Sequence, residues 1–400
     1  MQEILVVGFV SPLHKDRIPR PSGLNHIISS ADDIGRVAVV GNPILVAVVL
    51  SGGTSALIRD FVNHWGLNRV LLVSYPGNNS LASLLDAKSA ILDLGVRNVG
   101  VIHVDGLERL GTAIRLARAS ARLLRSRVAV IGLSTKTSII RNFEERFEAR
   151  VDLIPMEEFE ELINGVTDDE AGRFANELMG RALFNVPTND LLKVGRVYVA
   201  MRGLHGPYDA IAINCFPFLI RNRITPCLAL AKLNEEGLIS ACEGDLRALT
   251  VMLISRELTG YSGWIANVND VVGKSITMSH CTIALNMVEE PRVVTHFESG
   301  YNYGLTGKIK FREVTAASVS SDFRRMVAFK ALVSSSGLLR GDACRTQGVL
   351  QVDFEGYELL NEAPYNHHVV IPGNVIQDLR AVASLLGMEF KALAKAEVTT

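Results

Sequence analysis

Ionisable side chains at the ends of apolar segments are the residues of this chain whose types could do chemistry. Glu243 and Asp245 flank a glycine in "ISACEGDLRALTVMLI" (239–254), where a short apolar segment meets a helical pattern. Asp245 suits a helix N-cap, because a carboxylate there accepts backbone N–H groups and faces the positive end of the helix dipole. Capping does not account for Glu243, which lies on the strand side of the glycine.

Further candidates come from separate segments. "ANVND" ends at Asp270, His280 lies within the apolar "TMSHCT", and "APYNHHVVIPGN" contains the pair His367 and His368. Each has a structural alternative, since a strand histidine is often a hydrogen-bonded core residue and a histidine pair can lie in a solvated loop. Two carboxylates with histidines could equally form a site for a hard divalent ion. Such ligands suit Mn²⁺ or Mg²⁺, whereas structural zinc sites favour thiolates.

The elements that must position these residues begin with an α/β region over 1–153. Five apolar segments of the buried, parallel-strand kind alternate with helical patterns there: "ILVVGF", "ILVAVVL", "RVLLVSY", "VGVIHV" and "VAVIGL". We predict a doubly wound α/β domain. "SGGTSALIRDF" (51–61) follows a strand and opens a helix, so its amides could hold an anion, although it matches no phosphate-loop motif and is more simply a tight turn.

Two further regions complete the predicted architecture. Acid-rich helices, the strands "DAIAINC" and "LISAC" and their helices predict a second α/β domain over 154–259. From residue 260 the pattern becomes β-rich alternation, which predicts a mostly antiparallel barrel or sandwich over 260–400. The expected fold class is therefore α/β, with two Rossmann-like doubly wound α/β domains followed by a β-rich barrel-like C-terminal domain.

Composition excludes several classes of protein. Four hundred residues, 48% hydrophobic and 21% charged, suggest two or three well-packed domains and exclude disorder. A net charge of −1 without a dense Lys/Arg run makes nucleic acid and anionic membranes poor partners. Apolar runs are shorter than the roughly 18 residues that span a bilayer, and "MQEILVVGFV" suits a first strand rather than a signal peptide.

The cysteine and glutamine content adds two weaker expectations. Five widely spaced cysteines form no Cys-x-x-Cys pair, so neither a zinc knuckle nor a disulfide framework is indicated and a reducing cytoplasm fits. Only four glutamines occur among many Val, Ile, Leu and Arg residues, a composition that leans towards a thermophile.

Longer segments carry a family resemblance. "CLALAKLNEEGLISACEGDLRALTVMLISRELTG", followed by "ANVND" and "SHCT", resembles the L-fucose isomerase and L-arabinose isomerase superfamily. "NHHVVIPGNVIQDLRAVASLLGMEF" is similar to the C-terminal signature of that family, and "SYPGNNSLASLLDAKSAILDLG" to its N-terminal domain. The resemblance is dense around 225–283 and 344–390. It implies a Mn²⁺-dependent aldose–ketose isomerase, with Mg²⁺ or Co²⁺ as alternative divalent ions.

The resemblance also implies residue roles. Glu243 and Asp270 match the two carboxylate ligands, which also act as the acid/base pair. The C-terminal histidine ligand is His367 in the fucose-like register and His368 in the arabinose-like register. His280 matches a ligand of the arabinose branch, so that it either binds the metal or supports a residue that does.

Sugar contacts and assembly are less closely defined. Asn366, Arg345 and Gln347 are candidate substrate-binding residues, and Glu298 is a further polar group near the expected site. This chain is shorter than typical family members, which places substrate loops in doubt. By family resemblance we expect a small sugar substrate and a homo-oligomer, a hexamer or trimer, whose N-terminal domain caps a neighbour's pocket.

Three functions follow from these residues. The leading interpretation is a metal-dependent isomerase of a pentose or 6-deoxyhexose that works through an enediol. A metal-dependent epimerase or aldolase on the same scaffold would use the same metal and carboxylates. A sugar-binding protein without turnover is the third, although a pure binder has no need of paired acids.

Overall fold

The computed structural model describes residues 3–18 and 20–395 and divides into two compact units. The first unit comprises the chain up to Arg122 together with Gln377–Phe390, and the second comprises Leu123–Ile376 and the residues from Lys391. The predicted division at residues 153 and 259 stays a prediction. No helix in the described part of the chain is long and apolar enough to cross a membrane.

The first unit is built on a five-stranded parallel sheet in the order β2-β1-β3-β4-β5. The central strands bury almost every residue, as continuous Val/Ile/Leu runs require when helices cover both faces. The strands are β1 (Ile4–Phe9), β2 (His26–Ile28), β3 (Ile44–Val49), β4 (Arg69–Ser74) and β5 (Asn98–His103). The helices are α1 (Ala31–Ile34), α2 (Ser55–His64), α3 (Ser80–Asp93), η1 (Leu107–Arg109), α4 (Leu110–Leu123) and α13 (Ile376–Leu385).

The second unit opens with another parallel sheet, in the order β10-β9-β6-β7. Its strands are β6 (Arg127–Ile131), β7 (Arg150–Ile154), β9 (Ala210–Ile213) and β10 (Ser240–Ala241). The apolar segment "VAVIGL", expected beside the first four strands, forms β6 of this sheet, and the edge of the first sheet is completed by the short β2. Its helices are α5 (Ser138–Phe147), α6 (Met156–Asn164), α7 (Asp168–Met179), α8 (Leu191–Leu204), α9 (Cys215–Asn222), α10 (Cys227–Glu235) and α11 (Leu246–Thr259).

Six antiparallel strands then close into a barrel, because β15 pairs with both β18 and β16. The ring is β11 (Trp264–Val272), β12 (Ser275–His280), β17 (Thr346–Gln351), β16 (Arg325–Gly337), β15 (Glu313–Val319) and β18 (His368–Pro372), and β19 (Glu389–Leu393) pairs with β16 outside it. A small sheet joins β14 (Asn302–Ile309), β13 (Val288–Thr295) and β8 (Leu183–Phe184), and η2 (Leu285–Met287) and α12 (Tyr357–Glu362) lie in connections. The predicted mixed α/β architecture with parallel sheets and a β-barrel is confirmed.

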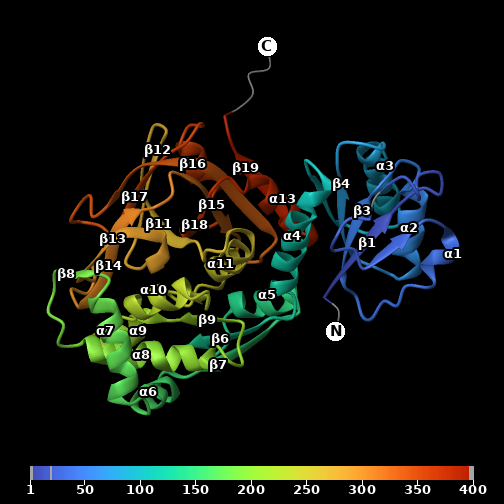
Figure 1. The fold of residues 1–400 in the computed structure, drawn as a ribbon. Helices are drawn as coiled ribbons and strands as arrows, with labels where there is room; N and C mark the ends of the chain where they lie inside the picture. Colours follow the sequence, from blue (N-terminus) through green and yellow to red (C-terminus); the bar gives the residue numbers. More distant parts are fainter. Residues whose placement is uncertain (1–2, 19, 396–400) are drawn as a thin grey trace. The chain divides into compact units, whose positions relative to one another are not determined.

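Helix α11 links the parallel sheet of the second unit to its barrel (Figure 1). It contacts β9 and β10 on one side and β15 and β18 on the other, which explains why its residues are buried around almost the whole helix. Asp245 caps its first turn, and Gly260, with φ of 79°, ends it. The turn before α11 is therefore held between the carboxyl ends of the parallel strands and the mouth of the barrel.

Candidate metal centre

Glu243 lies in a strained turn that joins β10 to α11. Its φ of 57° and that of Gly244, 63°, place two successive residues in the left-handed region, which costs a residue with a Cβ about 1–2 kcal/mol. The turn is held by the Gly244 amide, which donates to the Ile213 carbonyl at 2.8 Å. Residues held in this conformation cluster at functional sites, and here the Glu243 carboxylate faces two histidines of the barrel.

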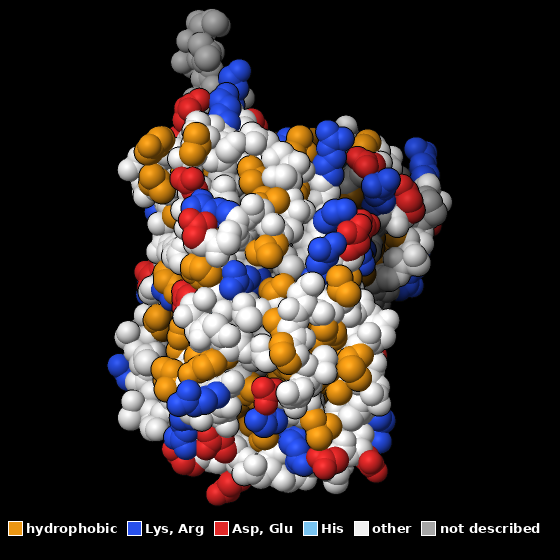
Figure 2. Space-filling model, turned by 90° about the vertical axis from the view of Figure 1, so that its left-hand side faces the viewer, with side chains coloured by type: hydrophobic (Ala, Val, Ile, Leu, Met, Phe, Trp, Pro, Cys, Tyr) orange, Lys and Arg blue, Asp and Glu red, His pale blue; other side chains and the backbone are white. Residues whose placement is uncertain are grey.

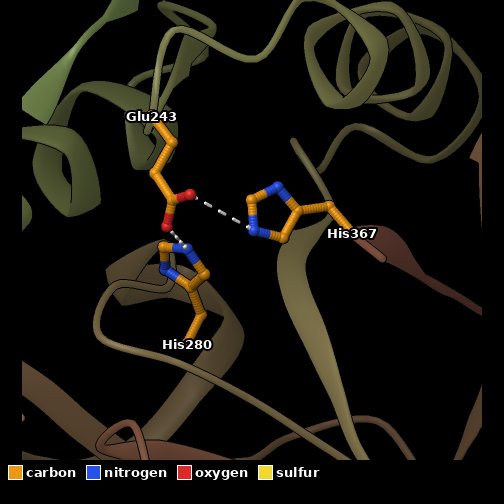
Figure 3. Close-up of side chains that lie close together, drawn as sticks. All are labelled: Glu243, His280 and His367. Atoms are coloured by element: carbon orange, nitrogen blue, oxygen red, sulfur yellow. Dashed lines mark ion pairs between the residues drawn. The ribbon is translucent and has the colours of Figure 1, made fainter. Parts of the chain in front are cut away.

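Two histidines from the barrel face this carboxylate (Figure 3). His280 ends β12, and its Nε2 lies 3.4 Å from Oε1 of Glu243. His367 immediately precedes β18, and its Nε2 lies 3.7 Å from Oε2 of the same carboxylate. One donor atom from each of the three residues lies within 4.8 Å of the others. Three segments far apart in the sequence thus converge on one point.

One side chain of this cluster, His280, is not satisfied by the described part of the protein. His280 is 3% exposed, yet neither of its ring nitrogens has a hydrogen-bond partner within the described residues. Leaving a buried polar group unpaired costs about 1–3 kcal/mol. A divalent cation between the carboxylate and the two imidazoles would satisfy all three donors, so the residues fit a metal ion.

Asp245 orients His367. Its Oδ2 lies 2.9 Å from Nδ1 of His367, while Oδ1 accepts from the amides of Arg247 and Ala248 at 2.9 and 3.3 Å. Nδ1 therefore carries a proton and donates it, which leaves Nε2, the ring atom that faces Glu243, as the position available to a metal ion. The expected helix cap at Asp245 is present, and the same carboxylate also supports a histidine of the cluster.

Charge and burial keep the carboxyl groups ionised. Burial raises the pKa of Glu243, but attraction to His280 and His367 outweighs it, so the pKa lies below the ordinary value. The pKa of Asp245 is likewise lowered, because the hydrogen bond from His367 and the charge of Arg247 exceed the effect of burial. The Arg247 guanidinium lies over the ring of Tyr365, which itself packs edge-on against His367.

A cavity of about 250 Å³ opens beside Glu243. Asn214, Asp245 and Arg247 line it, together with residues before and at the start of α5. This is the carboxyl edge of β6, β9 and β10, where parallel α/β sheets commonly bind ligands.

Asp270 is not part of the cluster. It is exposed on β11, where its carboxylate accepts from the Val271 amide at 2.9 Å. It pairs with Thr277, three residues along β12 from His280, which corresponds to a separation of about 10 Å. A bulge between Val268 and Asp270 shifts the register, so that Asn267 lies on the same face of β11 as Asp270. Asn267 pairs with Ser279, next to His280, and is therefore nearer the barrel mouth.

His367 and His368 lie in two different environments, because adjacent side chains of an extended segment point to opposite faces. His367 belongs to the cluster, whereas His368 packs beside Phe329, with ring centroids 5.9 Å apart. Nδ1 of His368 donates to the Asn366 carbonyl at 3.0 Å, and burial lowers the pKa of the ring to about 4. His368 is therefore a neutral core residue here: its Nε2 also lacks a hydrogen-bond partner among the described residues, but it does not belong to the group of converging ligand atoms.

The three candidate substrate contacts occupy different positions. Asn366 lies at the mouth, where its Nδ2 donates to Oδ1 of Asn267 at 2.5 Å. Arg345 binds the Thr295 carbonyl at 2.7 Å and faces Phe297. Gln347 is fully buried, and its amide is saturated by the backbone of residues 339–344. Only Asn366 lies next to a residue of the cluster.

Sequence reasoning did not identify Arg247, Tyr365 or Asn267 as neighbours of the site. Arg247 is two residues beyond Asp245, and Tyr365 is two residues before His367, so proximity to the motif residues was the available signal. For Asn267 there was no comparable signal, because its position depends on the bulge in β11.

Comparison with known proteins finds weak sequence similarity over part of the chain. No protein-family model matches the chain. Two curated proteins, each named sulfoquinovose isomerase, from Priestia aryabhattai and Priestia megaterium, are 24% identical to it over 195 residues. The aligned part covers 46% of this chain and 44% of each relative, so the chain spans less than half the length of the curated relatives it matches. The similarity is to sugar isomerases and does not single out the L-fucose/L-arabinose superfamily.

Proposed function

We propose that the protein is a metal-dependent aldose–ketose isomerase of the L-fucose/L-arabinose isomerase-like kind. The observation that carries this proposal is the cluster of Glu243, His280 and His367, whose ligand atoms converge beside a cavity while the buried ring of His280 has no hydrogen-bond partner among the described residues. The partial similarity to two proteins named sulfoquinovose isomerase supports the same class of reaction.

The donor set narrows the choice of ion. One carboxylate and two imidazoles suit Mn²⁺, Co²⁺ or Zn²⁺ better than Mg²⁺, which prefers oxygen ligands. Mn²⁺ is the first ion to test. When bound, a divalent ion supplies Lewis acidity that stabilises negative charge developing on the sugar oxygens, an effect worth several kcal/mol.

The chain's own residues supply positioning and proton transfer. The Glu243 carboxylate, ionised at neutral pH, takes the proton from C2 of the aldose and returns it to C1, passing through an enediol. The proton of the O2 hydroxyl passes to O1, so that the C1 aldehyde becomes an alcohol and C2 becomes a ketone. Proton transfer of this kind contributes roughly 10²–10⁴-fold to the rate. Asp245 keeps the Nε2 lone pair of His367 directed into the site throughout. One base on one face of the enediol is sufficient, so Asp270 is not required in this scheme.

Two substrate classes are compatible with the cavity. A pentose or 6-deoxyhexose follows from the family resemblance. A sugar acid such as a sulfonated hexose is favoured by Arg247, whose guanidinium lines the cavity, and by the substrate that the relatives' name states. We place both classes in the first test and expect a homo-oligomer, measurable by light scattering.

Proton NMR of aldoses incubated with the Mn²⁺-loaded protein in D₂O tests the proposal. L-Arabinose, L-fucose and sulfoquinovose form the panel, and an isomerase yields the ketose of at least one of them with deuterium at C1. A C2 epimer would identify an epimerase, and shorter fragments would identify an aldolase. No change in any sugar, at a protein concentration that binds Mn²⁺, would favour a binding protein and contradict the proposal.

A further inference from the structure

A second cavity of the second unit lies on the small sheet β14-β13-β8. Its volume is about 450 Å³, and it shares no lining residue with the cavity beside Glu243. Arg292 and Thr306 form its floor, and Leu338 and Leu339, just after β16, form a wall. Figure 2 views the side of the molecule where β8, β13 and β14 lie in Figure 1, and hydrophobic side chains are exposed there among charged ones.

This cavity is held in shape by hydrogen bonds of the protein. Arg292 and Thr306 pair across β13 and β14, so their side chains share one face of the sheet. Oγ of Ser336 accepts from the Ile309 amide at 2.9 Å, which fixes the end of β16 against β14. The buried amide of Gln347 accepts from the backbone amide of Leu339, also at 2.9 Å, and so anchors the leucine wall.

Two polar groups of the floor lack a protein partner. Thr306 is 2% exposed, and its Oγ1 has no hydrogen-bond partner among residues 3–18 and 20–395. Buried hydroxyl groups are normally paired, so this one points to a ligand. Arg292 is exposed and makes no hydrogen bond or ion pair within the same residues, while Lys308 is held by Glu290 at 3.0 Å. The three charges leave a net positive site.

We propose that this cavity binds a small organic anion. Its carboxylate or phosphate oxygens accept from the Arg292 guanidinium and the Thr306 hydroxyl, a charge-assisted arrangement suited to oxyanions. Its apolar body packs on Leu338 and Leu339, which are 49% and 46% exposed. The cavity has the size typical of small-molecule sites. The site is independent of the proposed isomerase activity.

Calorimetric titration of the full chain with sodium hexanoate and, separately, with inorganic phosphate tests this inference. Hexanoate supplies both the oxyanion and an apolar body, whereas phosphate supplies the oxyanion alone. We expect hexanoate to bind more tightly, and we expect Arg292→Gln to weaken it at least about tenfold. Thr306→Val should also weaken binding while leaving the melting temperature unchanged or higher, because it removes an unpaired buried hydroxyl.

Arg150→Gln is the matched control, since Arg150 is an exposed arginine at the start of β7 and lines neither cavity. It should bind hexanoate as the unmodified chain does. Absence of hexanoate binding at millimolar concentration would overturn the proposal. Phosphate binding as tight as hexanoate binding, or equal affinity in the Arg292 and control variants, would overturn it as well.

Discussion

The carboxyl edges of the two parallel sheets both carry polar side chains, but they differ in whether the polar groups there have hydrogen-bond partners within the protein. In the first unit, Oγ of Ser51 accepts from the Ser11 amide at 2.8 Å, and the Thr54 amide donates to Oγ of Ser83 at 3.1 Å. In the second unit, the Glu243 carboxylate at the edge of the parallel sheet faces two imidazoles of the barrel, and one of these, the buried ring of His280, has no hydrogen-bond partner in the described chain.

This difference separates a structural loop from a candidate site. Two amides of "SGGTSALIRDF" are used inside the first unit, since Gly52 donates to the Asn78 carbonyl at 2.7 Å and Thr54 to Oγ of Ser83. A loop whose polar groups bind each other gains nothing from a ligand. A cluster whose buried donors stay unpaired carries a free-energy cost that a bound ion would remove.

The largest effect is expected from Glu243→Gln, with Asp270→Asn as its matched control. Loss of Glu243 removes a ligand charge and the proposed base together, so kcat should fall at least about 10³-fold. Asp270→Asn should change kcat no more than about twofold, because Asp270 is exposed on the hairpin. Steady-state kinetics on the substrate identified by NMR provide the measurement. Equal losses of kcat in both variants would instead support the scheme in which Glu243 and Asp270 together form the acid/base pair.

The histidines should divide into two ligands and one core residue. His280→Ala and His367→Ala should each weaken Mn²⁺ binding more than about 100-fold, measured by calorimetry above pH 7 so that imidazole is neutral. His368→Ala should keep Mn²⁺ affinity within about tenfold and instead lower the free energy of unfolding by roughly 1–3 kcal/mol. The reverse order for His367 and His368 would favour the arabinose-like register.

Asp245→Ala should weaken Mn²⁺ binding about 10–100-fold, because His367 loses the acceptor that sets its tautomer. The variant also weakens the cap of α11, which costs about 1 kcal/mol. Thr167→Ala removes the comparable cap of α7, where no histidine is involved, and controls for that loss. If both variants bind Mn²⁺ as tightly as the unmodified chain, Asp245 serves only as a cap.

Ser83→Ala should have the smallest effect on metal binding and a clear effect on stability. The Thr54 amide would lose its acceptor inside the first unit, at a cost of about 1–3 kcal/mol in the free energy of unfolding. Chemical denaturation followed by circular dichroism measures this change. A loss of Mn²⁺ affinity without a loss of stability would contradict the contrast between the two edges.

Much of the fold could be predicted from local sequence patterns. Continuous Val/Ile/Leu runs predicted the parallel strands, and alternation after residue 260 predicted the barrel, because burial on two faces or one face determines those patterns. The helix cap at Asp245 could also be predicted. The assignment of "VAVIGL" to the second sheet could not be predicted, since strand pairing depends on contacts distant in sequence.

The individual residues of the candidate site could be predicted from the sequence, but their arrangement in space could not. The residue types of Glu243, His280 and His367 marked them as candidates. The bulge that leaves Asp270 away from the mouth, and the hydrogen bonds that saturate Gln347, arise from tertiary structure that no spacing in the sequence encodes.

Electron spin-echo spectroscopy of the Mn²⁺-loaded chain tests the central claim most directly, because it detects the nitrogen nuclei of imidazoles bound to the ion. The account predicts a signal from two coordinated imidazoles, reduced to one in His280→Ala and to one in His367→Ala, and unchanged in His368→Ala. A bound Mn²⁺ without imidazole coupling, or a signal that both single variants leave intact, would show that the ion binds elsewhere and would contradict the assignment of Glu243, His280 and His367 as its ligands.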